Sequence, residues 1–109
     1  MVDDARTIVF DFDGTLCTRV SPGEYDRIEP RHDVIGIANA FYDSGYKVVI
    51  YTARGMETFC GDLQKIERRW RAELERWLLT NGVRYDELIF GKPSADLYID
   101  DKCINIERI

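Results

Sequence analysis

The chain has 109 residues, of which 45% are hydrophobic and 32% are charged, and its formal net charge is −5. A chain of this length usually forms one domain and buries enough surface to fold without a metal or disulfide bonds. Its composition excludes a wholly disordered chain. The negative charge argues against strong binding to a nucleic-acid backbone, which needs clustered lysine and arginine side chains. We therefore expect a single domain over residues 1–109.

Targeting signals and the number and spacing of cysteines indicate the cellular compartment of a protein. No apolar run approaches the ~20 residues that a membrane-spanning helix needs. Residues 1–6 are acidic and lack the basic and apolar regions of a signal peptide. Cys17, Cys60 and Cys103 are odd in number and show no Cys-x-x-Cys spacing. We interpret them as reduced thiols and expect a cytoplasmic protein with no membrane partner.

The first predicted element is a strand at residues 7–12, a short run of β-branched and aromatic side chains that ends at a turn. Residues 17–30 contain two prolines and no helical period, which predicts a loop or a small hairpin. Apolar side chains at three- and four-residue spacing predict a helix from about Pro30 to Gly45. A second buried strand is expected at residues 46–52.

The second half of the chain continues this alternation. The longest predicted helix covers residues 57–80, with Trp70 and Trp77 in its apolar stripe and its charged side chains mostly outside it. Short strands are predicted at residues 87–90 and 96–99, and a last strand in the tail after Cys103. This order favours an α/β fold with a mostly parallel sheet covered by helices.

Polar side chains gather where the predicted strands end. The carboxyl ends of parallel strands share one edge of an α/β sheet, and ligands bind there. Clustered carboxylates need a counter-charge, and hard oxygen ligands favour Mg²⁺. A lysine and a threonine hydroxyl beside such a cation suit a phosphate group. The residues in question are Asp11, Asp13, Thr52, Arg54, Lys92, Asp100 and Asp101.

A cation beside a phosphate and a carboxylate indicates phosphoryl transfer. In that chemistry Asp11 attacks phosphorus and forms an aspartyl-phosphate. Asp13, two residues further on, acts as general acid and then as general base. The predicted activity is therefore that of an enzyme with a phosphate ester as substrate.

These residues also resemble the motifs of a known family. Residues 11–16, Asp-Phe-Asp-Gly-Thr-Leu, resemble motif I of the haloacid dehalogenase (HAD) superfamily. Thr52 resembles motif II, Lys92 resembles motif III and Asp100–Asp101 resembles motif IV, in the family's order over about residues 7–102. The resemblance implies a HAD-like, Rossmannoid three-layer α/β fold with a mostly parallel sheet.

The resemblance further implies a role for each matching residue. Asp11 is the nucleophile and a Mg²⁺ ligand, and Asp13 is the acid/base whose backbone carbonyl also binds the metal. Thr52 and Lys92 hold the transferring phosphoryl group. Asp100–Asp101 completes the metal site, with the division of roles between the two acids left open. An aspartate at position 13 is typical of the phosphatases and phosphomutases in this superfamily.

Larger members of the superfamily carry a cap domain over the site. The intervals after Asp13 and between Thr52 and Lys92 are too short to hold one. We therefore expect a capless phosphatase with an open site. Open sites suit large substrates, or small ones that a neighbouring subunit encloses, and two tryptophans on one helix make a homo-oligomer a further expectation.

Two segments narrow the expected substrate. Residues 51–56 and 91–102 resemble small bacterial phosphatases of capsule polysaccharide biosynthesis clusters. This resemblance implies a sugar phosphate or a nucleotide-linked sugar phosphate as substrate. Arg54 would then bind a second anionic group of the substrate, and the 17–30 loop would form a flap over it. The candidate contacts in that loop and just beyond it are Arg19, Glu24, Tyr25, Arg27 and Arg31.

Other interpretations of the same residues stay open. A nucleic-acid 3′-phosphatase or a phosphomutase would use the same site, although the net charge makes nucleic acid the less favoured partner. A catalytically silent HAD-fold binding module belongs to another class, and the intact motifs argue against it. The acids also have purely structural interpretations. An isolated Asp-x-Asp is usually a turn, and Asp100–Asp101 would then form a turn or a helix cap.

Overall fold

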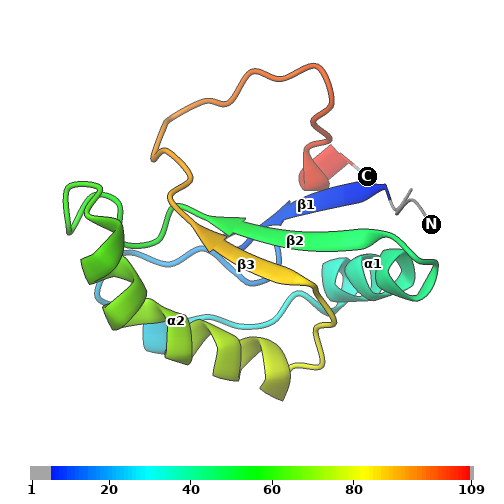
Figure 1. The fold of residues 1–109 in the computed structure, drawn as a ribbon, viewed down its shortest axis with the longest axis horizontal. Coiled ribbons are helices and arrows are strands. Elements are labelled where there is room, and N and C mark those ends of the chain that lie inside the picture. Colours follow the sequence, from blue (N-terminus) through cyan, green and yellow to red (C-terminus); the bar gives the residue numbers. More distant parts are fainter. Residues whose placement is uncertain (1–5, 109) are drawn as a thin grey trace, which may run out of the picture.

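The computed structural model describes residues 6–108. A parallel sheet of three strands forms its centre, and both α-helices lie on one side of that sheet (Figure 1). The structure confirms the α/β class and the parallel strands that the alternation predicts. The elements in chain order are β1 (Thr7–Asp11), the short 3-10 helix η1 (Tyr25–Arg27), α1 (His32–Asp43), β2 (Lys47–Thr52), α2 (Leu63–Thr80), β3 (Glu87–Phe90) and the 3-10 helix η2 (Ile106–Arg108).

The central strand is β2, which pairs with β1 on one side and with β3 on the other. Ile50 is opposite Phe10 of β1 and Leu88 of β3. Side chains alternate between the two faces of a strand, so these three point to the same face. The three strand predictions, at residues 7–12, 46–52 and 87–90, are confirmed to within one residue.

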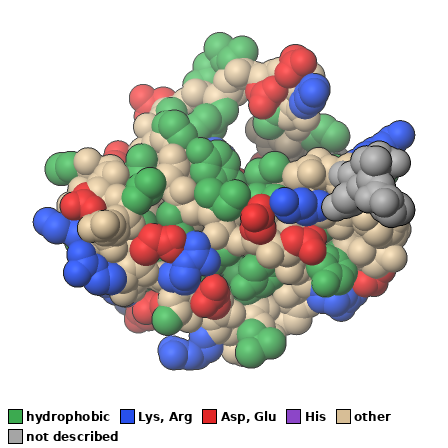
Figure 2. Space-filling view, in the orientation of Figure 1, with side chains coloured by type: hydrophobic (Ala, Val, Ile, Leu, Met, Phe, Trp, Pro, Cys, Tyr) green, Lys and Arg blue, Asp and Glu red, His purple; other side chains and the backbone are tan. Residues whose placement is uncertain are grey.

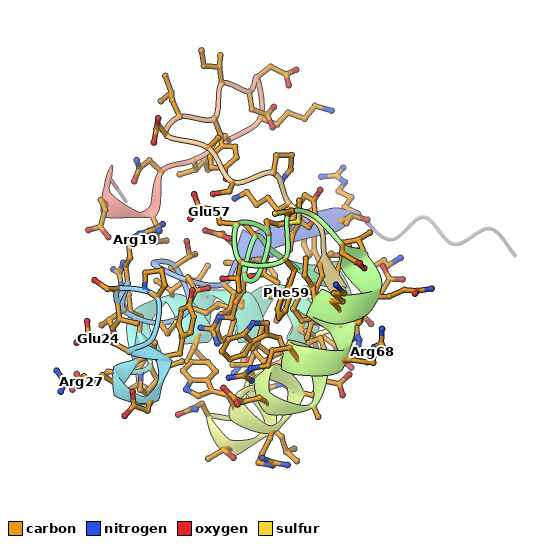
Figure 3. All side chains as sticks on the ribbon, turned by 90° about the vertical axis from the view of Figure 1, so that its left-hand side faces the viewer. Arg19, Glu24, Arg27, Glu57, Phe59 and Arg68 are labelled. Carbon is orange, nitrogen blue, oxygen red and sulfur yellow. The ribbon has the colours of Figure 1, made fainter. Side chains whose placement is uncertain are left out.

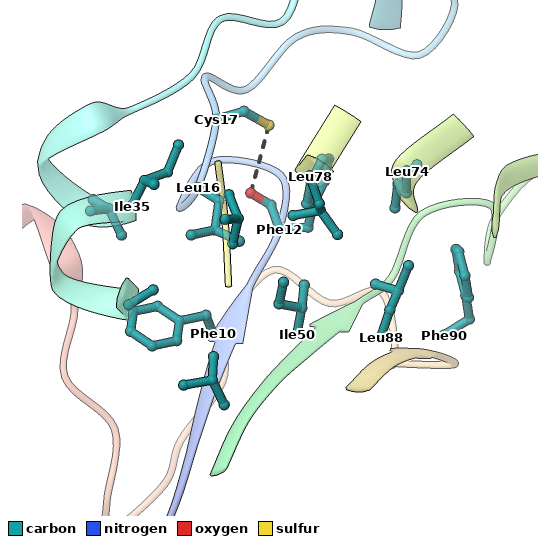
Figure 4. Close-up of a cluster of buried hydrophobic side chains, with 14 of the residues drawn as sticks. Phe10, Phe12, Leu16, Cys17, Ile35, Ile50, Leu74, Leu78, Leu88 and Phe90 are labelled. Carbon is teal, nitrogen blue, oxygen red and sulfur yellow. Dashed lines mark hydrogen bonds between the residues drawn. The ribbon is translucent and has the colours of Figure 1, made fainter. Parts of the chain in front are cut away.

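The core fills the space between this face and the two helices (Figure 4). Leu74 and Leu78 of α2 and Ile35 of α1 meet the strand side chains there. Phe12 and Leu16, directly after β1, are also completely buried. Each such side chain contributes roughly 1.5–3 kcal/mol relative to exposure to water. The turn that carries Asp13 is therefore anchored in the core at both of its ends.

The long helix α2 begins at Leu63, so the predicted start at residue 57 is wrong. Cys60 and Gly61 have φ values of 50° and 78°, which a right-handed helix does not allow. The Asp62 side chain then caps the helix by accepting a hydrogen bond from the backbone N–H of Lys65 at 3.3 Å. No helix within residues 6–108 combines the length and the hydropathy needed to cross a membrane.

The segment after β3 forms an arch. Residues 91–105 leave the end of β3, rise from the sheet and return to η2, and Figure 2 shows open space beneath them. The predicted strand at residues 96–99 is wrong, and the tail forms η2 instead of a strand. Arg31, just before α1, binds Glu107 of η2 at 2.7 Å and holds the far end of the arch.

Local contacts explain the conformation of the arch. The Tyr98 hydroxyl donates a hydrogen bond to the carbonyl oxygen of Pro93. The Asp100 carboxylate accepts one from the backbone N–H of Lys102 at 3.0 Å, which makes a turn. Leu97 and Ile99 are 73% and 90% exposed, so the aliphatic side chains of the run that predicted a strand are not buried here. A strand needs a paired edge as well as apolar residues.

The sheet therefore has two different faces. Both α-helices cover one of them, and no helix within residues 6–108 covers the other, where Val9 and Ile89 are exposed. This arrangement differs from the expected three layers. The interval between β1 and α1 holds a loop with η1, and the interval between β2 and β3 holds α2 with the turns around it.

Candidate active site

Three predicted site residues meet at the carboxyl edge of the sheet. Asp11 ends β1, Thr52 ends β2 and Lys92 follows β3. The backbone N–H of Lys92 donates a hydrogen bond to the Thr52 carbonyl oxygen at 3.1 Å. This bond holds the Lys92 backbone at the edge, and its Nζ lies 3.5 Å from Oδ1 of Asp11. The parallel strands β1 and β3, which flank β2, thus place a carboxylate and an ammonium together at one edge of the sheet, as the topology predicts.

The Asp11 carboxylate is partly buried and only partly neutralised. Burial raises its pKa above the ordinary value, and this is the largest influence. The Lys92 ammonium and the backbone N–H of Phe12 act in the opposite direction but do not cancel it. A further positive charge at this position would stabilise the ionised carboxylate.

The turn after β1 brings Asp13 to the same place. Gly14 has a φ of 83°, which glycine adopts without strain. The backbone N–H of Leu16 closes the turn on the carbonyl oxygen of Phe12 at 3.0 Å. Phe12 packs against Trp77 with a ring-centre distance of 5.1 Å. Buried side chains on both sides of the turn therefore fix the backbone that carries Asp13.

The Asp13 carboxylate binds Arg54 through both of its oxygens. Nη2 of Arg54 lies 2.5 Å from Oδ1 and Nε lies 3.2 Å from Oδ2. The Arg54 side chain is 1% exposed, and its guanidinium carbon lies 3.8, 4.7 and 5.2 Å from the ring centres of Tyr25, Trp70 and Phe12. The guanidinium is thus almost wholly buried and already paired, although Arg54 also lines the cleft described below. Its predicted role as a ligand for a second anionic group stays a prediction.

Thr52 makes a contact within the turn that follows β2, and its predicted role toward a phosphoryl group stays a prediction. Its side chain is completely buried, and Oγ1 accepts a hydrogen bond from the backbone N–H of Arg54 at 3.1 Å. The hydroxyl therefore shapes the turn that leads from β2 into Arg54. It does not belong to the wall of the cleft described next.

A cleft of about 240 Å³ opens in front of Asp11 and Asp13. Three segments line it: the loop that contains η1, the turn before α2, and the first part of the arch. Arg19 comes from the first segment and Glu57 from the second (Figure 3), while Tyr98 comes from the arch. The loop after β1 thus borders the cleft, which agrees with the position predicted for a flap.

Asp100 and Asp101 lie apart from the other acids. Both are exposed on the arch, and no group of three or more metal-ligating side chains occurs within residues 6–108. Two oxygen donors do suit a hard cation at the cleft: the Asp11 carboxylate, and the backbone carbonyl of Asp13, which accepts only a long bond of 3.4 Å from Arg19. Mg²⁺ commonly uses one or two carboxylates, with substrate oxygens and water completing its shell.

Sequence reasoning missed the surroundings of Arg54. Tyr25 was one of several polar residues in a loop, and Trp70 was one residue in an apolar stripe. Their rings meet edge-on at 5.0 Å, and both contact Arg54. Cys17 is a further neighbour, with its buried thiol 3.9 Å from Oδ1 of Asp13, and burial raises its pKa to about 12. Nothing in the spacing of these residues indicates that they meet.

The fold and the site define a small α/β protein whose acidic and basic side chains meet at the carboxyl edge of an open parallel sheet. A target protein from Vibrio cholerae has a crystal structure similar to this one, with a TM-score of 0.87 and 33% sequence identity over 94% of this chain and 85% of that chain. This chain belongs to the same protein family as that Vibrio cholerae protein.

A more distant similarity concerns the fold alone. A chain in the structure of the Pnkp1/Rnl/Hen1 complex matches with a TM-score of 0.58 and 23% identity, over 90% of this chain and 31% of that one. No protein-family model and no curated protein matches the chain.

Proposed function

We propose that this protein is a capless HAD-type phosphatase that hydrolyses a phosphate monoester through an aspartyl-phosphate on Asp11. The observation that carries the proposal is the partly buried Asp11 carboxylate, 3.5 Å from the Lys92 ammonium at the carboxyl edge of the sheet. The adjacent Asp13 and the cleft in front of both acids support it. So does the resemblance of residues 11–16 to motif I of the superfamily.

In the first step an Asp11 oxygen attacks phosphorus while the bond from phosphorus to the ester oxygen breaks. Asp13 gives its proton to the departing alcohol. Lys92 offsets the negative charge on the phosphoryl oxygens and on Asp11. The products of this step are the alcohol and an acyl phosphate on Asp11.

In the second step water attacks the same phosphorus. Asp13, now ionised, accepts a proton from that water, and the bond between phosphorus and the Asp11 oxygen breaks. Inorganic phosphate leaves, and both aspartates return to their starting states. One carboxylate therefore serves as nucleophile and the other as acid and base.

Mg²⁺ is the cofactor that the proposal includes. Asp11, through its carboxylate, and Asp13, through its backbone carbonyl, are the residues that would hold it. When bound, the cation supplies electrostatic stabilisation of the charge on the transferring phosphoryl group. A contribution from Asp100 or Asp101 stays a prediction, since it requires the arch to approach β1.

The proposed substrate is a sugar phosphate or a nucleotide-linked sugar phosphate. The resemblance of residues 51–56 and 91–102 to capsule polysaccharide phosphatases supports this choice. Because Arg54 is buried, we assign the recognition of a second anionic group to Arg19. Its side chain borders the cleft and is exposed.

The test is phosphate release from a panel of esters, with Mg²⁺ and with excess EDTA. The panel contains sugar phosphates, nucleotides, phosphorylated sugar nucleotides and a 3′-phosphorylated oligonucleotide. Asp11→Asn removes the nucleophile and should abolish release. Asp43→Asn is the matched control, because Asp43 ends α1 at the other end of the strands, and it should retain full activity.

Each outcome of the panel has a definite meaning. Release that requires Mg²⁺ and disappears in Asp11→Asn supports the proposal, and the best ester identifies the substrate class. A preference for the oligonucleotide would favour the nucleic-acid 3′-phosphatase. Phosphate moved within the substrate, with none released, would favour a phosphomutase. Full activity of Asp11→Asn, or no turnover of any ester, would contradict the proposed mechanism.

A further inference from the structure

We propose that Arg54 is a positioning residue that fixes the orientation of the Asp13 carboxylate, and that Tyr25 holds Arg54 in place. This inference rests on the proposed function, because it assigns Arg54 a task in the proton transfers of Asp13. It replaces the role in substrate binding that the sequence predicted. It also connects the loop around η1 to the chemistry of the site.

Arg54 and Asp13 are joined by two hydrogen bonds. The two nitrogens of Arg54 that face Asp13 bond separate carboxylate oxygens, at 2.5 and 3.2 Å. Such two-point contact restricts rotation of the carboxylate more than a single bond does. Each carboxylate oxygen has a second lone pair, so Asp13 can still exchange a proton with a leaving group or with water. The pair therefore orients the acid without blocking it.

The two side chains of this pair differ in burial. The Arg54 side chain is 1% exposed, whereas that of Asp13 is 19% exposed. Both residues line the cleft, but the guanidinium offers a substrate almost no surface of its own. A substrate therefore meets mainly the Asp13 carboxylate of this pair. An arginine in this position acts through its neighbour.

Tyr25 and Trp70 form an aromatic clamp around the Arg54 guanidinium. The guanidinium carbon of Arg54 lies 3.8 Å from the ring centre of Tyr25 and 4.7 Å from that of Trp70. Aromatic faces attract a guanidinium and limit its movement. Trp70 belongs to α2, whereas Tyr25 belongs to η1 and also borders the cleft. The position of this loop therefore bears on the orientation of Asp13.

The test compares two esters that differ in how much they need an acid. An alkyl phosphate has a poor leaving group and needs protonation, whereas a nitrophenyl phosphate has a good leaving group and does not. Arg54→Lys keeps the charge but loses the planar two-point contact. The readout is the rate constant of the first step, measured as alcohol release in a single turnover, because the second step is the same for both esters. We expect this rate constant for the alkyl phosphate to fall roughly 10–100-fold in Arg54→Lys, because a positioned general acid contributes about 10²–10⁴-fold. The same rate constant for the nitrophenyl phosphate should fall much less, and both KM values should stay nearly unchanged.

The chain contains a matched control for this substitution. Arg84 binds Asp43 through two nitrogens, at 3.0 and 2.7 Å, but this pair is exposed. Arg84→Lys should leave both first-step rate constants unchanged. Tyr25→Phe keeps the ring over Arg54 and should lose much less of the first-step rate on the alkyl phosphate than Tyr25→Ala does. Tyr25→Ala should reproduce the selective loss on the alkyl phosphate.

Other kinetic results would overturn the proposal. A raised KM at an unchanged first-step rate constant in Arg54→Lys would make Arg54 a substrate ligand. An equal loss of the first-step rate constant on both esters would indicate a structural role alone. A near-wild-type first-step rate constant for the alkyl phosphate in Arg54→Lys would show that the two-point contact is not needed.

Melting temperatures give a readout that does not depend on activity. If Arg54 holds Asp13, the double variant of Asp13→Asn and Arg54→Lys should lose less than the sum of the two single losses. Additive losses would contradict the contact. If the wild type hydrolyses no ester, the proposed function and the catalytic task of Arg54 both fail. A non-additive loss of melting temperature in the double variant would then show that Arg54 and Asp13 form a structural contact only.

Discussion

Two arginine–aspartate pairs in this molecule have the same bonding pattern and opposite surroundings. Arg54 and Asp13 meet at the carboxyl ends of the strands, with side chains 1% and 19% exposed. Arg84 and Asp43 meet beside the amino ends of β2 and β3, with side chains 48% and 60% exposed. In both pairs Nε and Nη2 bond separate carboxylate oxygens. The two pairs therefore have the same bonding but differ in burial and in the end of the sheet at which they lie.

Burial matters here because of the competition with water. An exposed ion pair exchanges good hydration for a contact of similar quality, so it contributes about 0–1 kcal/mol. A buried pair has lost that hydration, and either partner left alone is a charge that water cannot reach. The buried pair at the cleft is therefore more sensitive to the loss of one member.

The largest expected effect comes from removing one acid of each pair. Asp13→Ala leaves the buried Arg54 without a counter-charge and should lower the free energy of unfolding by about 3–5 kcal/mol. Asp43→Ala leaves Arg84 in water and should cost under about 1 kcal/mol. Urea unfolding followed by circular dichroism measures both. Equal losses would mean that burial does not separate the two pairs.

A smaller effect should follow from the turn that carries Arg54. Gly55 has a φ of 84°, and an added Cβ would lie 3.1 Å from Ile66 and 3.3 Å from Trp70. Gly45 has a similar φ of 92° with no atom that close, so it is the matched control. Gly55→Ala should cost about 1–3 kcal/mol more than Gly45→Ala, because only the first adds a clash to the backbone strain. Equal costs in urea unfolding would show that the turn does not need its close approach to α2.

The smallest effect at neutral pH concerns the cysteines. Cys17 is buried beside Asp13 with a pKa raised to about 12, whereas Cys60 and Cys103 are exposed. A thiol-alkylating reagent should therefore modify Cys60 and Cys103 in the folded protein and reach Cys17 only after unfolding. Mass spectrometry of the labelled peptides shows which cysteines were modified. Rapid labelling of Cys17 would show that the region behind Asp13 opens easily.

The same thiol predicts a direction for stability against pH. In the unfolded chain Cys17 loses its proton near its ordinary pKa of 9.0, whereas in the folded protein it keeps the proton to about 12. The folded state therefore binds more protons between these values, and the free energy of unfolding falls as the pH rises through this range. Urea midpoints of Cys17→Ala and of the wild type, compared at pH 8 and at higher pH, test this; a constant difference would contradict it.

Much of the fold was predictable from local pattern. The strand at residues 87–90 is a short apolar run between turn residues, and it appears at β3 as expected. The strand at residues 96–99 has the same kind of pattern and is absent, because pairing depends on a partner edge that local sequence does not reveal. The late start of α2 depends on Cys60, a non-glycine residue with a φ of 50° that propensity does not anticipate.

One contact of the candidate site was predictable from the sequence and another was not. Asp11 and Lys92 meet because parallel strands share a carboxyl edge, a rule that needs no side-chain detail. The partner of Arg54 was beyond this reasoning, since a guanidinium pairs equally well with a substrate anion or with Asp13. In this structure it pairs with Asp13, and Tyr25 packs over the guanidinium. The spacing of these residues in the sequence predicts neither contact.

The most direct test of the central claim is to find the phosphoryl group on the protein. The Asp13→Asn variant lacks the base for the second step. It is mixed with Mg²⁺ and nitrophenyl phosphate, whose good leaving group departs without an acid, and is then quenched in acid. Peptide mapping by mass spectrometry then locates any added phosphoryl group. The proposed mechanism predicts it on Asp11, and predicts none in a double variant that also carries Asp11→Asn. Rapid phosphate release by the wild type with no phosphoryl group on Asp11 in this experiment would contradict the account.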